Sequence, residues 1–508
     1  MPKKNSRRTI ESTGADKASR RGFLKGGAGL VAGAAAAQLL PRQIAAQQNA
    51  GNAGLLERLA NPGGRPIILK NGYVLSLDSQ VGDFERGDVL IQGKKILSVG
   101  PNLAAPAQSI VVDAAGMIVM PGFVDTHHHQ YETVLRAINA DGRLGTLPFY
   151  PEAKSYRTVI QAIFTPIFLP EDARVAELIA SLNQINVGVT TTVDTSQVQL
   201  TPAHTDACIA GLKESGRRAL FTYTVGGPDA ATKFPQELQR LRKQYFSSDD
   251  QLLTLGSGGG SQEQWKIARS IGAPIVNHVV GQSANLNALA QAGLMGPDNE
   301  YIHCTRLSDG MWKMIADTGG KVSIATAIEM KSGQGTPPIQ AALDHGIQPS
   351  LSVDNETSMP ADFFTQMRAT FTVQRMFINE RTLNGEQNVP SLMKSRDAIE
   401  MATIAGAKAA HLDSKIGSLT PGKEADIIML ATDRLNVAPL NNVPGAIVTL
   451  MDTSNVENVF IAGKVMKWEG KLVGVDVKRV IQDANKSCEG LLARGKYTRD
   501  LFGSCCIA

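Results

Sequence analysis

The 508-residue sequence predicts an α/β fold: a (β/α)8 TIM barrel with a small β-sandwich domain built from both flanks of the barrel. Two observations predict this fold. Strand and helix patterns alternate through residues 121–410, and short strands separated by turn residues lie on either side, at 64–120 and 411–475. Alternation over this length favours a closed parallel barrel over an open sheet. An active site would then lie at the carboxyl ends of the barrel strands.

Composition places the chain among globular proteins, because 43% of its residues are apolar and 19% are charged. The chain is too long for one ordinary core, but a barrel of about 250 residues plus a smaller domain accounts for most of it. The net charge is only +4, and several basic residues lie near the N-terminus. The mature protein should therefore be near neutral, which gives no case for nucleic-acid binding.

The N-terminal residues 1–46 have the pattern of a targeting signal. Ser19-Arg20-Arg21-Gly22-Phe23-Leu24-Lys25 precedes a Gly- and Ala-rich run at 26–40 that is too short and too weakly apolar for a membrane span. The pattern resembles a bacterial twin-arginine signal, so we expect the twin-arginine export machinery as a partner and no stable membrane insertion. Cleavage near Ala45-Ala46 would leave a soluble periplasmic or otherwise exported protein. The alternative is a basic disordered tail.

The small domain is predicted from two groups of short strands, which follow a polar linker at 47–63. Gly, Asn and Asp separate the strands at 64–120, and the same texture returns at 411–475. We therefore expect both flanks to form one β-sandwich domain. A C-terminal helix and tail would occupy 476–508.

Individual elements of the barrel can be placed in order. The β-branched stretch 187–194 predicts a strand. A helix is predicted over 261–271, where Ser261 and Gln264 have the spacing of a capping box. The apolar residues that follow, 273–277, predict the next strand, which ends at His278.

The first barrel strand ends in a cluster of imidazoles, Phe123-Val124-Asp125-Thr126-His127-His128-His129. Side chains on a strand alternate between faces, so His127 and His129 point the same way and are close enough to bind one metal ion. His128 points to the opposite side, where it is expected to pack or to contact neighbours rather than bind metal. The alternative, a merely polar strand end, explains poorly why three of only eight histidines are adjacent.

Three further polar residues fall where barrel strands should end. His278 and His303 each follow an apolar strand pattern, and Asp354 follows Ser350-Leu351-Ser352-Val353. The imidazoles of His127, His129 and His278 with the carboxylate of Asp354 suit one divalent metal ion, Zn²⁺ first, with Fe²⁺ or Mn²⁺ as alternatives. The competing interpretations are core histidines and a helix-capping aspartate.

This order of strand-HxH, His, His and Asp, together with Gly417-Ser418-Leu419-Thr420-Pro421-Gly422-Lys423-Glu424-Ala425-Asp426, resembles the amidohydrolase superfamily. The resemblance covers roughly residues 64–470 and is greatest to the metal-dependent deaminases and chlorohydrolases that act on triazines, pyrimidines and related heterocycles. It implies that His127, His129 and His278 bind the metal. It also implies that Asp354 contacts the metal and takes a proton from the bound water, and that His303 polarises the substrate or stabilises the tetrahedral adduct.

The sequence departs from the family pattern at two places. In one branch of the superfamily, a lysine on the fourth barrel strand bridges two metal ions. The stretch predicted to be that strand here, Thr190-Thr191-Thr192-Val193-Asp194-Thr195, has no lysine, which favours a single ion. Gly281 stands where the deaminase branch usually has a proton-donating Glu, three residues after His278. Glu329, expected on the seventh strand, and Glu356, two residues past Asp354, are candidate replacements. The stretches 130–137 and 141–149 are expected to shape the substrate pocket.

The leading hypothesis is a metal-dependent hydrolase that uses an activated water to cleave a non-peptide C–N bond in a small cyclic or aryl compound. One alternative is a dechlorinating or deaminating hydrolase of a heterocycle. Others are a dipeptidase-like hydrolase and a non-catalytic metal- or ligand-binding protein on the same fold. A homodimer is a further expectation from the family resemblance.

Overall fold

The computed structural model describes residues 54–145, 154–224, 230–281 and 285–502. The predicted signal at 1–46 and the last residues of the predicted tail lie outside this range, as do residues 146–153 of a predicted pocket loop. The chain divides into two compact units, Met1–Arg58 and Leu59–Ala508, and every element named below belongs to the second. None of the described helices is both long and apolar enough to cross a membrane.

Eight parallel strands form the barrel, and they are hydrogen-bonded in chain order from β6 to β13. The strands are β6 (Phe123–His128), β7 (Val189–Asp194), β8 (Arg218–Tyr223), β9 (Leu253–Gly258), β10 (Ile275–Val280), β11 (Asn299–Thr305), β12 (Lys321–Ile324) and β13 (Ser350–Leu351). This sheet confirms the predicted barrel. The prediction that residues 190–195 form its fourth strand was wrong, because residues 190–194 belong to the second strand, β7, and the fourth is β9. Short parallel strands with helices between them bury both faces, which explains their nearly continuous apolar or small residues.

The barrel closes between its first and last strands at the predicted metal site. Because β13 has only two residues, the closing contacts come from the chain beyond it. The N–H of Asp354 donates to the His127 carbonyl at 2.9 Å, and the N–H of His129 donates to the Asp354 carbonyl at 2.6 Å. The seam of the barrel therefore holds Asp354 beside the histidines of β6.

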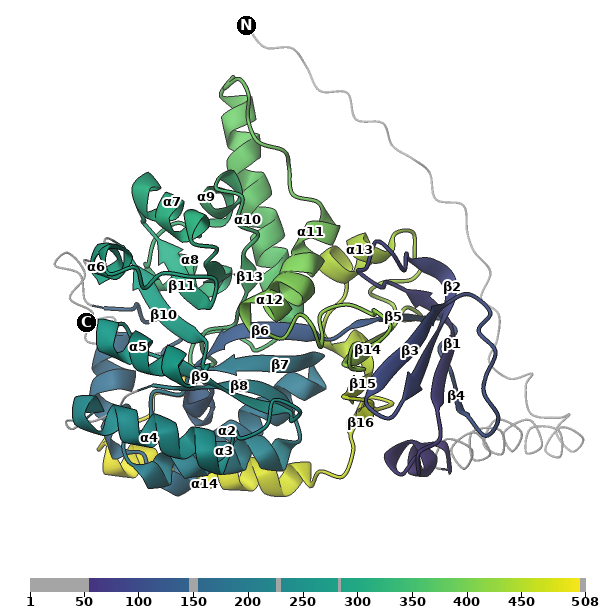
Figure 1. Ribbon diagram of the computed structural model, residues 1–508, viewed down its shortest axis with the longest axis horizontal. Helices are drawn as coiled ribbons and strands as arrows, with labels where there is room; N and C mark the ends of the chain where they lie inside the picture. Colours follow the sequence, from purple (N-terminus) through teal and green to yellow (C-terminus); the bar gives the residue numbers. More distant parts are fainter. Residues whose placement is uncertain (1–53, 146–153, 225–229, 282–284, 503–508) are drawn as a thin grey trace, which may run out of the picture. The chain divides into compact units, whose positions relative to one another are not determined.

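Helices follow most barrel strands and cover the outside of the barrel; Figure 1 shows α2 to α5 beside β7, β8 and β9. The capping box predicted from Ser261 and Gln264 begins α5, where the Ser261 hydroxyl accepts from the Gln264 N–H at 3.2 Å. The helices are α2 (Pro170–Asn186), α3 (Pro202–Ser215), α4 (Ala230–Gln244), α5 (Gln262–Ser270), α6 (Asn285–Gln291), α7 (Asp309–Asp317), α8 (Thr326–Ser332), α9 (Ile339–Asp344), α10 (Phe363–Leu383), α11 (Ser395–Glu400), α12 (Gly406–Ala409), α13 (Val443–Gly445) and α14 (Val477–Arg494).

The strands of both flanks are joined in one nine-stranded sheet. Antiparallel pairing between β5 and β14 links the N-terminal strands to the C-terminal ones. The strands of this sheet are β1 (Ile67–Val74), β2 (Phe84–Gln92), β3 (Lys95–Gly100), β4 (Ile110–Asp113), β5 (Met117–Pro121), β14 (Ile427–Ala431), β15 (Val456–Ile461), β16 (Lys464–Trp468) and β17 (Lys471–Leu472). The two-layered arrangement of a β-sandwich stays a prediction.

A buried ion-pair cluster ties the flanking sheet to the barrel. Arg218 of β8 is 1% exposed, and its guanidinium donates to Glu424 at 2.6 Å and to Asp426 at 2.8 Å. Asp426 immediately precedes β14, and its carbonyl accepts from the Gly122 N–H at the start of β6. This contact fixes the entry into the strand that carries the histidine cluster.

Candidate metal centre

The predicted ligands come together at the carboxyl ends of the barrel strands. His127 belongs to β6 and His129 directly follows it, while His278 comes from β10. Their ring nitrogens lie within 4.8 Å of one another, and a second group with the same spread contains His127, His303 and Asp354. Residues separated by more than two hundred positions in the chain thus surround one point.

Thr195, one residue beyond β7, orients two of the imidazoles. His127 Nδ1 lies 3.1 Å from the Thr195 hydroxyl, and His129 Nδ1 lies 2.8 Å from the Thr195 carbonyl. Both Nε2 atoms then face the cluster, at 3.4 Å and 3.5 Å from Asp354 Oδ1. His127 Nε2 is buried and has no hydrogen-bond partner among the described residues. A metal-binding imidazole is typically held in this way through its second nitrogen.

The surroundings of the cluster keep its imidazoles neutral and its carboxylate ionised. Burial lowers the pKa of His127 and His278, and it lowers the pKa of His129 to about 3. Burial opposes ionisation of Asp354, but its contact with His127 and the neighbouring imidazoles lower its pKa below the usual range. Neutral imidazoles and an ionised carboxylate are the forms that bind divalent metals. The residues therefore fit one divalent cation.

His303 lies beside the second carboxylate oxygen of Asp354, and its other ring nitrogen contacts Glu329. Its Nε2 is 3.8 Å from Asp354 Oδ2, and its Nδ1 is 3.2 Å from Glu329 Oε1. Burial opposes protonation of His303, but Glu329 and Asp354 raise its pKa. Glu329 belongs to helix α8 and not to the predicted seventh strand, which ends at Ile324. It is fully buried against His303, so the structure places it behind the imidazole and not in the cavity.

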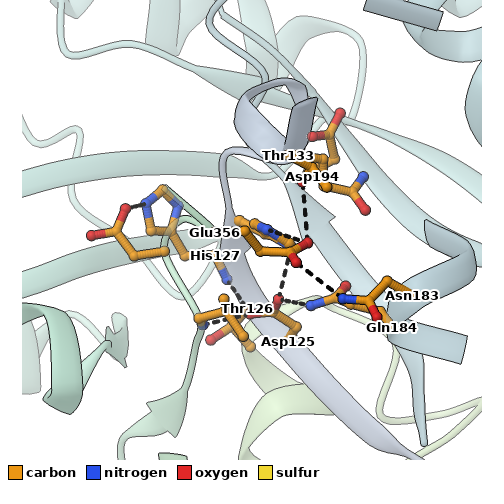
Figure 2. A network of polar contacts seen from close by, with 12 residues as sticks. Asp125, Thr126, His127, Thr133, Asn183, Gln184, Asp194 and Glu356 are labelled. Carbon is orange, nitrogen blue, oxygen red and sulfur yellow. Dashed lines mark hydrogen bonds and ion pairs between the residues drawn. The ribbon is translucent and has the colours of Figure 1, made fainter. Parts of the chain in front are cut away.

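Glu356 belongs to the polar network of Figure 2, and its Oε1 lies 3.9 Å from His128 Nε2. Glu356 accepts hydrogen bonds from Arg136 at 2.8 Å and from Asn183 at 3.0 Å. His128 Nδ1 is 3.4 Å from Asp125. Neither Glu356 nor His128 lines the cavity beside the metal cluster, and His128 lies away from the metal-facing histidines, as strand alternation predicts.

A cavity of about 470 Å³ opens above the metal cluster. Its floor is formed by His129, His278, His303 and Asp354. Its walls carry mostly amide, hydroxyl and aliphatic side chains: Asn139, Leu144, Tyr156, Arg157, Gln161, Gln197, Val280, Ile328, Ser332, Gln334, Asn355 and Ser358. Leu144 comes from the predicted pocket loop, whereas the predicted stretch after His129 forms a buried 3-10 helix, Gln130–Leu135. A small polar molecule fits this space.

A family model for the amidohydrolase family matches residues 118–466, more than half of the chain. The chain belongs to the amidohydrolase family. This amidohydrolase is 28% identical over 462 residues to a 5'-deoxyadenosine deaminase of Methanosarcina mazei, with 84% of the chain and 99% of the relative covered. It is 25% identical over 452 residues to a 5-methylthioadenosine/S-adenosylhomocysteine deaminase of Desulfitobacterium hafniense, with 84% of this chain and 98% of the relative covered.

Solved structures share the fold of the amidohydrolase. A zinc-bound adenosine deaminase from Xanthomonas campestris has a TM-score of 0.71 at 19% identity, covering 84% of this chain and 98% of that one. A zinc complex of atrazine chlorohydrolase from Arthrobacter aurescens TC1 has a TM-score of 0.72 at 19% identity, covering 83% and 100%. Together with the family match, the relatives confirm the prediction of a hydrolase that acts on non-peptide carbon–nitrogen bonds of a small molecule.

Sequence reasoning did not single out Tyr156, which lines the cavity of the amidohydrolase, or its contact with Glu132, which lies in the predicted pocket stretch 130–137. The Tyr156 hydroxyl donates to Glu132 Oε1 at 2.5 Å, and Tyr156 lines the cavity while Glu132 is fully buried behind it. Burial raises the pKa of Glu132 to about 8, although the bond from Tyr156 opposes this shift. The signal for Glu132 was a single charge three residues after His129, within an uncharged stretch. Tyr156 gave no comparable signal, because only the fold brings it to Glu132.

Proposed function

We propose that this amidohydrolase releases an exocyclic amino group from a small nitrogen heterocycle by hydrolysis, with one divalent cation, zinc first and iron or manganese as alternatives. The convergence of His127, His129, His278 and Asp354 carries the proposal. The deaminase names of the relatives and the zinc in the solved structures support it.

The described residues supply a base and a polarising group. When bound at this cluster, a divalent cation lowers the pKa of water and stabilises negative charge. The Asp354 carboxylate, which is ionised beside His127, accepts a proton from the attacking water as the oxygen bonds to the ring carbon. His303, oriented by Glu329, donates a hydrogen bond that stabilises the tetrahedral adduct.

The leaving nitrogen needs a proton, and Gly281 has no side chain to give one. Asp354 holds the proton that it took from water and can pass it to the nitrogen as the C–N bond breaks. One carboxylate then serves as base and acid, and the overall reaction consumes one water and releases one ammonia. Tyr156 presents a further hydroxyl on the cavity wall.

Hydrolytic dechlorination of a heterocycle is a second candidate, because chloride departs without a proton. Gly281 favours it over deamination on this ground, and the fold shared with atrazine chlorohydrolase is compatible with it. The same cation, base and polarising imidazole would serve both reactions.

We also propose that the protein is exported to the periplasm through the twin-arginine pathway and works there as a soluble enzyme that binds a single metal ion. Support comes from the paired Arg20 and Arg21, the Gly- and Ala-rich run after them, and the lack of a bridging lysine in β9, the fourth barrel strand. A homodimer remains a prediction from the family resemblance.

The test begins with metal analysis of the purified mature protein, followed by ammonia and chloride release. The panel contains 5'-deoxyadenosine, 5'-methylthioadenosine, aminopyrimidines and chlorinated triazines, with dipeptides and N-acyl amino acids as comparison substrates. About one metal per chain and metal-dependent ammonia release would support the proposal. Chloride release alone would select the second candidate, peptide cleavage would select a dipeptidase, and bound metal with no turnover would leave a binding protein.

A further inference from the structure

Gln334 is presented to the cavity by a turn with a glycine on each side. Helix α8 ends at Ser332, and Gly333 and Gly335 have φ values of 73° and 133°. Non-glycine residues rarely adopt such values. A Cβ at Gly335 would also lie only 2.9 Å from Cγ of Arg306. The Gln334 N–H donates to the Glu329 carbonyl at 3.3 Å, which ties the backbone of Gln334 to helix α8.

The side-chain amide oxygen of Gln334 is buried and has no partner among the residues that the structure describes. The residue is 3% exposed, lines the same cavity as His303 and Asp354, and its Oε1 has no hydrogen-bond partner among the described residues. Within the described part of the chain Asn139 Oδ1 also has no partner, but it is packed against Gly142, where a Cβ would lie 1.9 Å away. Buried polar atoms are normally hydrogen-bonded, so an unpaired amide in a binding cavity points to a ligand that pairs with it.

We propose that Gln334 determines substrate specificity by binding a donor–acceptor edge of the heterocycle, an amino N–H beside an unprotonated ring nitrogen. The amide oxygen accepts from the amino group, and the amide N–H donates to the ring nitrogen. A glutamine amide matches such an edge with two hydrogen bonds, as it does with adenine. Glu329 bonds to the Gln334 backbone through its carbonyl and to His303 through its carboxylate, so recognition occurs beside the polarising imidazole.

This proposal rests on the amino-heterocycle substrate class proposed above, and binding tests it separately from turnover. The zinc-loaded Asp354→Asn protein is titrated by calorimetry with adenosine, 1-deazaadenosine and 7-deazaadenosine. In 1-deazaadenosine the ring nitrogen N1 is replaced by CH, and in 7-deazaadenosine N7 is replaced. Each of these nitrogens lies beside the 6-amino group on one edge of the base. Adenosine should bind about tenfold to a hundredfold more tightly than one of them, the ratio expected for a lost bidentate contact.

Adding Gln334→Leu to the same background should remove this preference, and Gln334→Glu, which keeps the shape but loses the donor, should weaken it. Gln387→Leu, at an exposed site after α10, is the matched control and should retain the preference. If Gln334→Leu does not fold, as judged by its thermal unfolding and zinc content, the Glu variant decides. An unchanged preference in the Gln334 variants, or no preference in the parent, would overturn the inference. A Gln334-dependent preference without ammonia release by the wild type would support it and refute only the deamination.

Discussion

Asp354 is joined to His127 twice, through the backbone where the barrel closes and through the side chains at the metal site. Its N–H donates to the His127 carbonyl at 2.9 Å, and its Oδ1 lies 3.4 Å from His127 Nε2. The closing hydrogen bonds fix the position of the carboxylate independently of its charge. Replacing the charge should therefore leave the geometry of the site intact.

Asp354→Asn should lower kcat by about a hundredfold to ten-thousandfold, the usual contribution of a general base, while the three histidines retain much of the metal. The measurement is ammonia release together with metal content by atomic emission. Asp317→Asn, at the exposed end of α7 beside Lys313, is the matched control. An unchanged kcat in the Asp354 variant would remove this residue from the mechanism.

The sequence predicted the barrel and the grouping of the metal-facing residues because both follow from local rules. Alternation along β6 sets which histidines share a face, and parallel strand ends meet at one edge of the barrel. His278, His303 and Asp354 could be placed for the same reason. Their roles stay predictions, and the structure supplies the distances that make them testable.

The positions of the two candidate acids could not be obtained in this way. The apolar residues around Ile324 suit a strand or a buried helix equally well. The predicted strand therefore extends to Glu329, whereas in the structure α8 begins at Thr326. The last barrel strand, β13, already ends at Leu351, so alternation no longer tells which way Glu356 points. The Tyr156 contact with Glu132 is set by tertiary packing alone.

Glu329→Gln should lower kcat about tenfold to a hundredfold with the metal retained, as expected for a partner that orients a functional imidazole. Glu329 helps to raise the pKa of His303, so its loss should shift the pH-rate limb assigned to His303 to lower pH. Glu356→Gln, outside the cavity, should lower the melting temperature without moving that limb. A pH profile that is identical for both variants would contradict the positioning role.

Gly281→Glu should not restore a proton donor. Gly281 has a φ of 67°, so a side chain there costs about 1–2 kcal/mol of folding free energy. Its Cβ would lie 3.3 Å from Arg306 Nη2, which would hold the new carboxylate as an ion pair. Denaturant unfolding should show the loss of stability, and ammonia release should not rise. The double variant with Arg306→Ala removes the ion pair, and a rate increase in the single variant would refute this account.

Lys467 should make stability depend on pH above neutrality. It is 3% exposed, its ammonium donates to the Asn186 carbonyl at 2.6 Å, and burial lowers its pKa to about 8. An unfolded lysine titrates near about 10.4, so between these values the unfolded state binds more protons and the free energy of unfolding rises with pH. Below about pH 8 both states are protonated and the cost of burying the charge is fully present.

Denaturant unfolding of the wild type and Lys467→Met from pH 7 to 10.5 measures this effect. The difference in the free energy of unfolding should shift in favour of the wild type as pH rises through the window. Lys464→Met, at an exposed position of the same strand, controls for the removal of one lysine. If the difference in the free energy of unfolding between the two proteins is constant from pH 7 to 10.5, the pKa of Lys467 is not lowered in the folded protein.

Replacing Arg20 and Arg21 by lysine should block export. A twin-arginine signal is read by its paired guanidinium groups, and lysine keeps the charge but loses their planar geometry. In a bacterial host with a working twin-arginine pathway, the unprocessed precursor should accumulate in the cytoplasm, as measured by cell fractionation and immunoblotting. Lysines at Arg7 and Arg8, a second arginine pair without the Gly-Phe-Leu-Lys continuation, should leave export intact. Equal export of both variants would show that residues 19–25 are not the signal.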